Sequence, residues 1–137
     1  MPARRAMTDR RAPRRISRLA LATLLLGTGA LHFLGTSSYE AIVPPALGRG
    51  HARALVLGSG AAEIAAGALL AFHRTRRLGA GLAAGLFVVV FPANVQMAVD
   101  GGIAGAGFPL GSPVVAWLRL PLQAPLVWWA LTLTRRE

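Results

Sequence analysis

Two charged side chains within long apolar stretches of the sequence are the first candidates for chemistry. Glu63 stands in the middle of an apolar run over residues 52–72, and Arg119 stands in a later run, one helical turn before Gln123. As a helix rising about 1.5 Å per residue, such a run would cross the roughly 30 Å hydrocarbon core of a bilayer. An acid at mid-span costs about 2.5–3.5 kcal/mol on insertion scales, so it faces the bundle interior, is protonated or has a partner. We therefore predict that Glu63 and Arg119 are energetically coupled, directly or through Gln123.

Three further polar side chains join these charges in a layer displaced toward the outer face. Counted at ~1.5 Å per residue from the expected outer helix ends, His32 lies ~5 Å deep, Asn94 and Arg119 ~8 Å, Gln123 ~14 Å and Glu63 ~17 Å. A direct contact between Glu63 and Arg119 would have to close the axial gap of roughly 9 Å that this count leaves. The pattern predicts an intramembrane polar cluster, open to the outer face, that binds a small amphipathic ligand. Its members are His32, Glu63, Asn94, Arg119 and Gln123.

The chemistry of these side chains suits a quinone, because Arg119, His32 and Gln123 could donate hydrogen bonds to its carbonyl oxygens. Each residue also has a simpler interpretation, and the alternatives stay open at this point. Arg119 would snorkel to outer lipid phosphates, and His32 would be an interfacial packing residue. Asn94 would satisfy the backbone carbonyl that a nearby proline frees. No pattern assigns a catalytic residue, and the three histidines lack the HExxH-like spacing of a metal site, so none is predicted.

The apolar blocks that must position these residues predict an all-α fold, a four-helix transmembrane bundle. The expected spans cover residues 16–35, 52–72, 78–99 and 114–134, in a membrane domain over residues 19–134. Residues 1–18 are polar and Arg-rich and are expected to form a disordered cytoplasmic tail. Between the first two spans lies an outer loop that is expected to cap the entrance to the cavity, through Tyr39, Glu40, Pro44 and Pro45.

Proline and glycine mark details of the last two spans. Pro92 should leave the carbonyl of Val88 without its helical partner, and prolines at 121 and 125 should interrupt the last span. Gly81 and Gly85 have the small-xxx-small spacing that lets helix backbones approach closely. We expect the prolines to loosen the helices at the depth of the polar cluster.

Composition and charge narrow the class of protein. The chain has 137 residues, 54% of them hydrophobic, and its 15 basic residues are all arginine. Seven arginines lie in the amino-terminal tail at residues 1–18, three lie in the turn at 73–77 and two follow the last span, against two in the outer loops. This asymmetry predicts that both termini are cytoplasmic, and it explains the net charge of +10 without nucleic acid as a partner. With no cysteine, the chain itself cannot exchange disulfides, form a Cys-ligated zinc site or hold an iron–sulfur cluster.

Five short motifs in order together resemble the DoxX-like family of small bacterial membrane proteins. They are Leu31-His32-Phe33, Tyr39-Glu40-Ala41-Ile42-Val43-Pro44-Pro45, Ser59-Gly60-Ala61-Ala62-Glu63, Phe91-Pro92-Ala93-Asn94 and Arg119-Leu120-Pro121-Leu122-Gln123. The resemblance runs from about residue 29 to residue 129 and implies a four-helix transmembrane bundle. It also implies a place in membrane oxidoreductase systems that pass electrons from sulfur compounds to quinone or work beside thiol and superoxide defence enzymes. Because this chain lacks cysteine, such a role would require a quinone or a partner subunit.

Three functions remain open from the sequence. The first is an accessory protein of the cell membrane, without catalytic activity of its own, that binds a quinone-like or other small amphipathic ligand for a membrane or cytoplasmic oxidoreductase subunit. The second is a small proton-coupled transporter in which Glu63 titrates. The third is a structural scaffold without a ligand. The lipid bilayer is an expected partner in all three, and a homo-oligomer would matter most for the transporter, since four short helices leave little room for a pathway.

Overall fold

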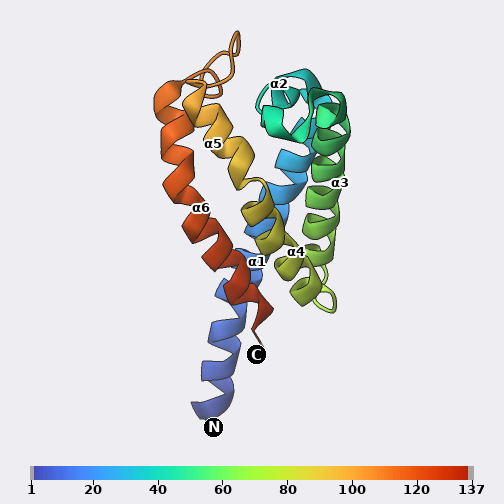
Figure 1. Ribbon diagram of the computed structural model, residues 1–137. Coiled ribbons are helices and arrows are strands. Elements are labelled where there is room, and N and C mark those ends of the chain that lie inside the picture. The colour runs from blue at the N-terminus through green and yellow to red at the C-terminus, as the bar shows by residue number, and fades with distance from the viewer. Residues whose placement is uncertain (1, 136–137) are drawn as a thin grey trace.

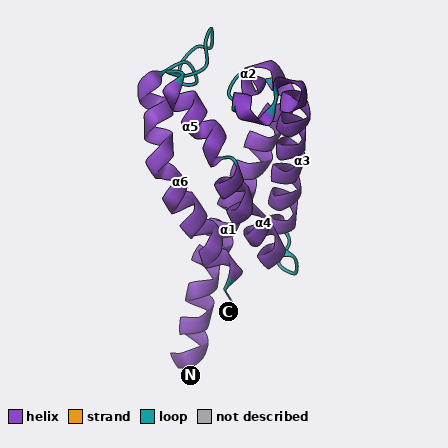
Figure 2. Cartoon of the chain, in the orientation of Figure 1, coloured by secondary structure: helices purple, strands orange, loops and turns teal. Residues whose placement is uncertain are grey.

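The chain consists of helices and loops throughout the part that the structure describes. The computed structural model describes residues 2–135, with side chains from residue 12 onward, and has no strand in that range (Figure 1, Figure 2). The predicted all-α class is confirmed. In chain order the α-helices and 3₁₀ helices are α1 (Pro2–Leu34), α2 (Thr36–Glu40), η1 (Pro45–Leu47), η2 (Arg49–His51), α3 (Ala52–Ala71), α4 (Arg76–Val89), α5 (Phe91–Val99) and α6 (Pro113–Thr134).

Four helical segments are long and apolar enough to cross a membrane, as the sequence predicted. They are Ala12–Leu34, Arg49–Ala71, Arg76–Val99 and Pro113–Thr134. Large apolar side chains such as Val89, Leu118 and Trp128 are exposed on these segments, where lipid would cover them. The chain is therefore a multi-pass membrane protein built as a four-helix bundle.

The helices form two pairs that meet firmly at only one end of the bundle. α1 packs along α3, α5 and α6 pack together, and α4 joins the pairs through contacts with both α3 and α6. Figure 1 shows both ends of the chain on the same side of the bundle as the turn between α3 and α4, and we call this side the terminal end. At the opposite end, which we call the loop end, lie α2 and the loop at residues 100–112, and the two pairs of helices diverge toward it.

The amino-terminal segment differs from its prediction. Residues 2–18, expected to form a disordered tail, continue α1 back to Pro2. Proline is well tolerated at the first helical position because its missing N–H has no helical partner there, and arginine is a good helix former. The first candidate span begins at Ala12, so Arg14, Arg15 and Arg18 lie in its first two turns.

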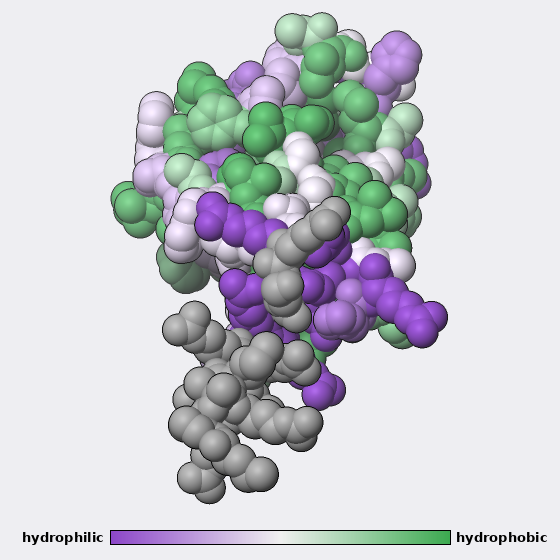
Figure 3. Space-filling view, turned by 90° about the horizontal axis from the view of Figure 1, so that it is seen from below, coloured by the Kyte–Doolittle hydropathy of each residue, from purple (hydrophilic) through white to green (hydrophobic). Residues whose placement is uncertain are grey.

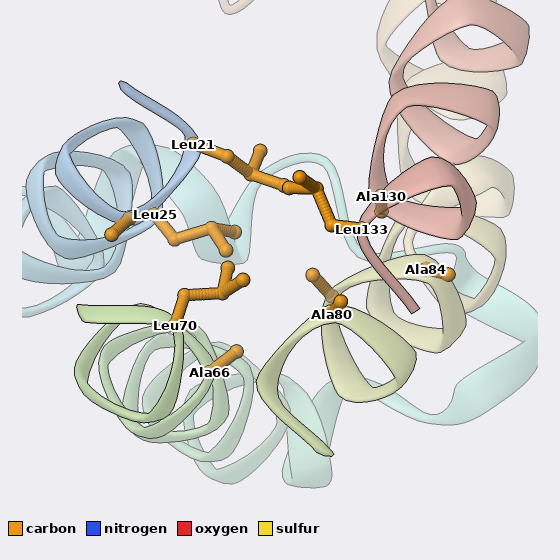
Figure 4. Close-up of a cluster of buried hydrophobic side chains, with 10 residues drawn as sticks. Leu21, Leu25, Ala66, Leu70, Ala80, Ala84, Ala130 and Leu133 are labelled. Atoms are coloured by element: carbon orange, nitrogen blue, oxygen red, sulfur yellow. The ribbon is translucent and has the colours of Figure 1, made fainter. Parts of the chain in front are cut away.

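The apolar core at the terminal end joins all four long helices. Figure 4 shows Leu21 and Leu25 of α1 pointing toward Leu70 of α3 and Leu133 of α6, with alanines of α3, α4 and α6 around them. A second apolar cluster, which includes Met97 of α5, lies near the loop end. Between the two clusters lies the layer that carries the polar side chains.

Close approach of helices depends on glycines other than the predicted pair. A methyl group added at Gly60 of α3 would lie 2.6 Å from the Cβ of His32 and 3.0 Å from the carbonyl oxygen of Gly29, both on α1. A methyl group at Gly81 or Gly85 would meet nothing within 4 Å. The prediction that Gly81 and Gly85 bring helices together is therefore wrong for contacts within the chain, and Gly29 with Gly60 performs that role between α1 and α3.

Proline acts on the third span but does not break the last one. The third span is interrupted at Val90, between α4 and α5, and Pro92 lies in the first turn of α5. By contrast, α6 is one helix that contains Pro121 and Pro125, so the predicted interruption of the last span is wrong. The break at Val90 lies at the level of the polar layer and opens the backbone there.

Candidate functional site

A cavity of about 360 Å³ lies between the two helix pairs and the loop after α2. The structure brings together all five residues of the predicted polar cluster, because His32, Glu63, Asn94, Arg119 and Gln123 all line this cavity. Tyr39 and Pro44 of the expected entrance loop also line it, whereas Glu40 and Pro45 do not. Most of the remaining wall is apolar, with side chains such as Leu24, Leu55, Phe87, Val90 and Leu126.

Glu63, on α3, is buried with 8% of its surface exposed. Its Oε2 accepts a hydrogen bond from Thr28 Oγ1 on α1 at 2.6 Å, and lies 3.8 Å from His32 Nδ1. Thr28 Oγ1 is also 3.0 Å from the carbonyl oxygen of Leu24, so Glu63 is the nearest of its acceptors. A charge-assisted hydrogen bond of this length is among the stronger polar interactions in a protein. The Thr28 hydroxyl on α1 therefore provides a hydrogen bond to one of the two carboxylate oxygens.

His32 is held in one orientation by groups on three segments. Its Nδ1–H donates to the carbonyl oxygen of Thr28 at 2.8 Å, and because a carbonyl can only accept, the hydrogen lies on Nδ1. The imidazole stacks on the ring of Tyr39, with 4.1 Å between centroids and 22° between planes. Nε2 faces Ser59 Oγ at 3.4 Å, with the serine hydroxyl as donor. His32 thus links α1 and α3 to the short helix α2.

Asn94 and Gln123 form a second polar group on the opposite wall of the cavity. Asn94 Nδ2 donates to Gln123 Oε1 at 3.2 Å, and Gln123 Nε2 donates to the carbonyl oxygen of Phe87. The helix break after Val89 makes that carbonyl available to a side chain. The sequence predicted a freed carbonyl at Val88, and one of the interpretations left open was that Asn94 bonds to it. In the structure the carbonyl bonded by a side chain is that of Phe87, and its partner is Gln123.

Arg119 differs from the other polar residues of the cavity, because no described residue forms a hydrogen bond or ion pair with it. The predicted direct pair with Glu63 is absent from the described part of the chain, and Gln123 is occupied by Asn94 and Phe87, so it does not bridge the two. Glu40 forms its ion pair with Arg53 at 3.8 Å on the surface. The Arg119 guanidinium is therefore available to a group inside the cavity.

Tyr39 supplies a second available polar group. Burial raises the pKa of its phenol above the usual value, while the Arg119 guanidinium lowers that pKa and the Glu63 carboxylate raises it. A phenol is protonated at neutral pH even at its ordinary pKa of 10.0, and the increase moves it further from ionisation, so the Tyr39 hydroxyl is a hydrogen-bond donor. Its position against both His32 and the cavity follows from α2, which folds back over the end of α1.

Sequence reasoning missed three groups that complete the site: Thr28, Ser59 and the Phe87 carbonyl. A signal for Thr28 exists, because it lies four residues before His32 and so shares a helix face with it. Ser59 likewise lies four residues before Glu63. No residue type in the sequence indicates a role for the Phe87 carbonyl, because its availability depends on where the helix breaks.

Four apolar spans around one cavity with a buried polar lining define a small multi-pass membrane protein with an internal candidate ligand site. Residues 21–134 match the family described as domain of unknown function DUF8561, and the chain belongs to that family. No curated protein and no solved structure matches the chain.

Proposed function

We propose that the chain is an accessory protein of the bacterial cell membrane that holds a quinone-like or other small amphipathic ligand in the cavity beside Arg119. The observation that carries this proposal is the Arg119 guanidinium, which lines a largely apolar cavity and has no partner among the described residues. A cation in such a place is costly unless it has an acceptor. A bound ligand with a carbonyl or anionic oxygen would provide that acceptor.

The residues present fit the head group of a quinone. A volume of about 360 Å³ falls within the range of roughly 300–1,000 Å³ typical of ligand pockets. Arg119 and the Tyr39 hydroxyl are available donors for ring oxygens, and Nε2 of Gln123, which donates one hydrogen to a backbone carbonyl, keeps a second. Nδ1–H of His32 already donates to the carbonyl of Thr28 and is not available. The apolar wall would contact the ring and the start of the tail. When bound, a quinone would supply electron transfer coupled to protons, which the side chains of this chain cannot supply.

The wider assignment rests on the sequence motifs and the arginine distribution. We infer a relation to the DoxX-like family and a role beside a membrane or cytoplasmic oxidoreductase subunit, with no catalytic activity in this chain. The arginines at the terminal end support cytoplasmic termini and location in the cell membrane. A homo-oligomer is compatible with this assignment, and nucleic acid has no place in it.

A second candidate, a proton-coupled transporter, is favoured by the contact between Glu63 and His32. The Glu63 carboxylate lies 3.8 Å from His32 Nδ1 within a membrane span, and ionisable pairs in such positions serve as proton relays in transporters. Proton uptake into proteoliposomes separates the two functions. A flux that Glu63→Gln abolishes would support the transporter, and its absence would support the accessory protein.

Thermal unfolding with added quinone tests the main proposal. The full chain in mild detergent is titrated with short-chain ubiquinone and menaquinone analogues, and the unfolding temperature is recorded. A ligand at a hundredfold excess over its dissociation constant stabilises the folded state by about 2.7 kcal/mol, so we expect a saturable rise for at least one analogue. Arg119→Ala should abolish that rise.

Arg53→Ala is the matched control, because it removes the same charge from an exposed side chain that does not line the cavity. We expect it to respond to quinone as the wild type does. An unchanged unfolding temperature in the wild type would contradict the quinone proposal and favour the scaffold. Equal rises in the wild type and Arg119→Ala would show that the quinone binds elsewhere.

A further inference from the structure

A second cavity, of about 450 Å³, lies at the terminal end and is lined by basic side chains from three segments. Arg14, Arg15 and Arg18 come from α1, while His73 and Arg76 come from the turn between α3 and α4 and the start of α4. The end of α6 closes it. In Figure 3, which shows this end of the molecule, hydrophilic side chains gather in one area beside hydrophobic ones. We propose that this cavity, which is separate from the proposed quinone site, binds a phosphate group.

Arg18 is the residue that points to a ligand. Only 9% of its surface is exposed, and its buried Nη1 forms no hydrogen bond to any described residue. A buried guanidinium nitrogen without an acceptor is strongly unfavourable, so such a group in a native structure indicates an unseen water or ion. Because Arg18 lines a cavity large enough for a small anion, an anion in that cavity would supply the acceptor.

The other described groups around the cavity also suit an anion. Ser17 Oγ accepts a hydrogen bond from Trp129 Nε1 at 2.7 Å, which holds the serine in place and leaves its hydroxyl hydrogen free to donate. Arg76 is buried as well, with 8% of its surface exposed. Among the described lining residues there is no aspartate or glutamate. Arg14, Arg15 and Arg18 thus add positive charge to a lining whose described residues include no carboxylate.

Phosphate is favoured over carboxylate by the number and directions of the donors. A guanidinium presents a planar fork that pairs with two oxygens at once, and four arginines converge here from two parts of the chain. A carboxylate has two oxygens in one plane, whereas a phosphate presents more oxygens, distributed tetrahedrally. A phosphate group can therefore accept from several of these arginines together, whether it belongs to a lipid head group or is free in solution.

The membrane-orienting role of arginine does not explain this arrangement. Positive charge that sets topology needs to be near the membrane but does not need to be buried. Arg74 and Arg77 in the same turn meet that need, since both are exposed and neither lines the cavity. Arg77 therefore provides a control with the same charge in the same region.

The test measures the unfolding temperature of the full chain, freed of lipid in an uncharged detergent. One arm compares sodium phosphate with sodium chloride at equal ionic strength. The other arm adds phosphatidylglycerol or phosphatidylcholine to the micelles without inorganic phosphate. We expect a saturable rise in at least one arm. A rise with inorganic phosphate shows that the free ion suffices, and a rise with phosphatidylglycerol alone identifies a lipid head group as the source.

Variants distinguish binding in this cavity from a general attraction between opposite charges. Arg18→Gln should weaken the apparent affinity by about tenfold or more, because it removes hydrogen bonds to a charged group, and Arg77→Gln should change it by less than about twofold. Arg15→Gln, at an exposed position on the rim, should also weaken binding. If Arg18→Gln does not fold, Arg15→Gln is compared with Arg77→Gln in its place. No rise in either arm, or equal losses in the cavity variants and Arg77→Gln, would overturn the proposal.

Discussion

At the scale of single residues, the two membrane-buried charges have different roles. The Thr28 hydroxyl on α1 donates to Glu63 and the His32 ring lies beside it, so the carboxylate contributes to the packing of α1 against α3. Arg119 has no such partner in the described part of the chain and lines the cavity instead. The carboxylate therefore belongs to the internal structure, and the guanidinium is the group that we propose meets a ligand.

Replacing Thr28 by valine tests the role of the carboxylate. Valine keeps the size of threonine but removes the donor, and a buried acceptor left without its partner costs about 1–3 kcal/mol. We expect Thr28→Val to lower the free energy of unfolding in detergent by that amount. Thr23→Val, on the exposed side of the same helix, should change it little, because Thr23 bonds only to the carbonyl of Leu19. Equal losses in the two variants would contradict the assigned contact.

A double-mutant cycle compares the two partners considered for Glu63. Thr28→Val and Glu63→Gln should be strongly non-additive, because their side chains are in direct contact. Glu63→Gln and Arg119→Gln should add within about 0.5 kcal/mol, since no contact joins them among the described residues. The free energies of unfolding of the single and double variants measure both couplings. A larger coupling with Arg119 than with Thr28 would restore the ion pair that the sequence suggested.

The sequence was sufficient to predict which residues meet but not how they pair. A constant rise per residue gives each polar group a depth, and five groups that all lie in the outer half or near the middle of four spans are expected to converge. Depth does not give the rotation of each helix about its own axis. That rotation decides that Glu63 faces Thr28 on α1 and that Gln123 faces the Phe87 carbonyl on α4.

At the scale of helices, close packing of α1 against α3 positions the polar wall of the cavity. Gly29 and Gly60 remove the side chains that would separate the two helices, next to His32 and Glu63. Gly81 and Gly85, whose small-xxx-small spacing predicted such a contact, face open space. The sequence shows that small residues recur in the second and third spans. It does not show which helix face packs, because that depends on the neighbouring helices.

Adding one methyl group tests this close contact. In Gly60→Ala the new methyl would lie 2.6 Å from His32 Cβ, and overpacking of this kind costs about 1–3 kcal/mol. Gly58→Ala, two residues earlier on α3, would meet nothing within 4 Å and should be neutral or slightly stabilising, because alanine is the better helix former. Denaturant unfolding in detergent measures both. A stable Gly60→Ala would show that α1 and α3 are farther apart than described.

At the scale of the whole molecule, the two candidate sites lie in different parts of the bundle. The cavity beside Arg119 lies toward the loop end, where the helix pairs diverge, and the arginine-lined cavity lies at the terminal end. If the arginines mark the cytoplasmic side, the ligand cavity is on the outer side of the membrane. The lengths of the apolar blocks in the sequence were sufficient to predict the number of spans. The orientation remains a prediction from the arginine count.

Cysteine labelling tests that orientation without interference, because the chain has no cysteine of its own. Single cysteines at Thr36, Thr75 and Gly105 are treated in intact cells with a reagent that does not cross the membrane. We expect labelling at Thr36 and Gly105 but not at Thr75, which should react only after the cells are opened. Labelling of Thr75 from outside would invert the topology.

Photolabelling by a quinone tests directly whether the cavity beside Arg119 binds the proposed ligand. An azido-quinone is crosslinked to the full chain in native membranes, and the modified residues are mapped by mass spectrometry. We predict labels on cavity residues such as Phe87, Val90 and Tyr39, which unlabelled quinone displaces and Arg119→Ala abolishes. Labels concentrated on lipid-facing residues such as Trp128, equally strong in Arg119→Ala, would contradict the claim.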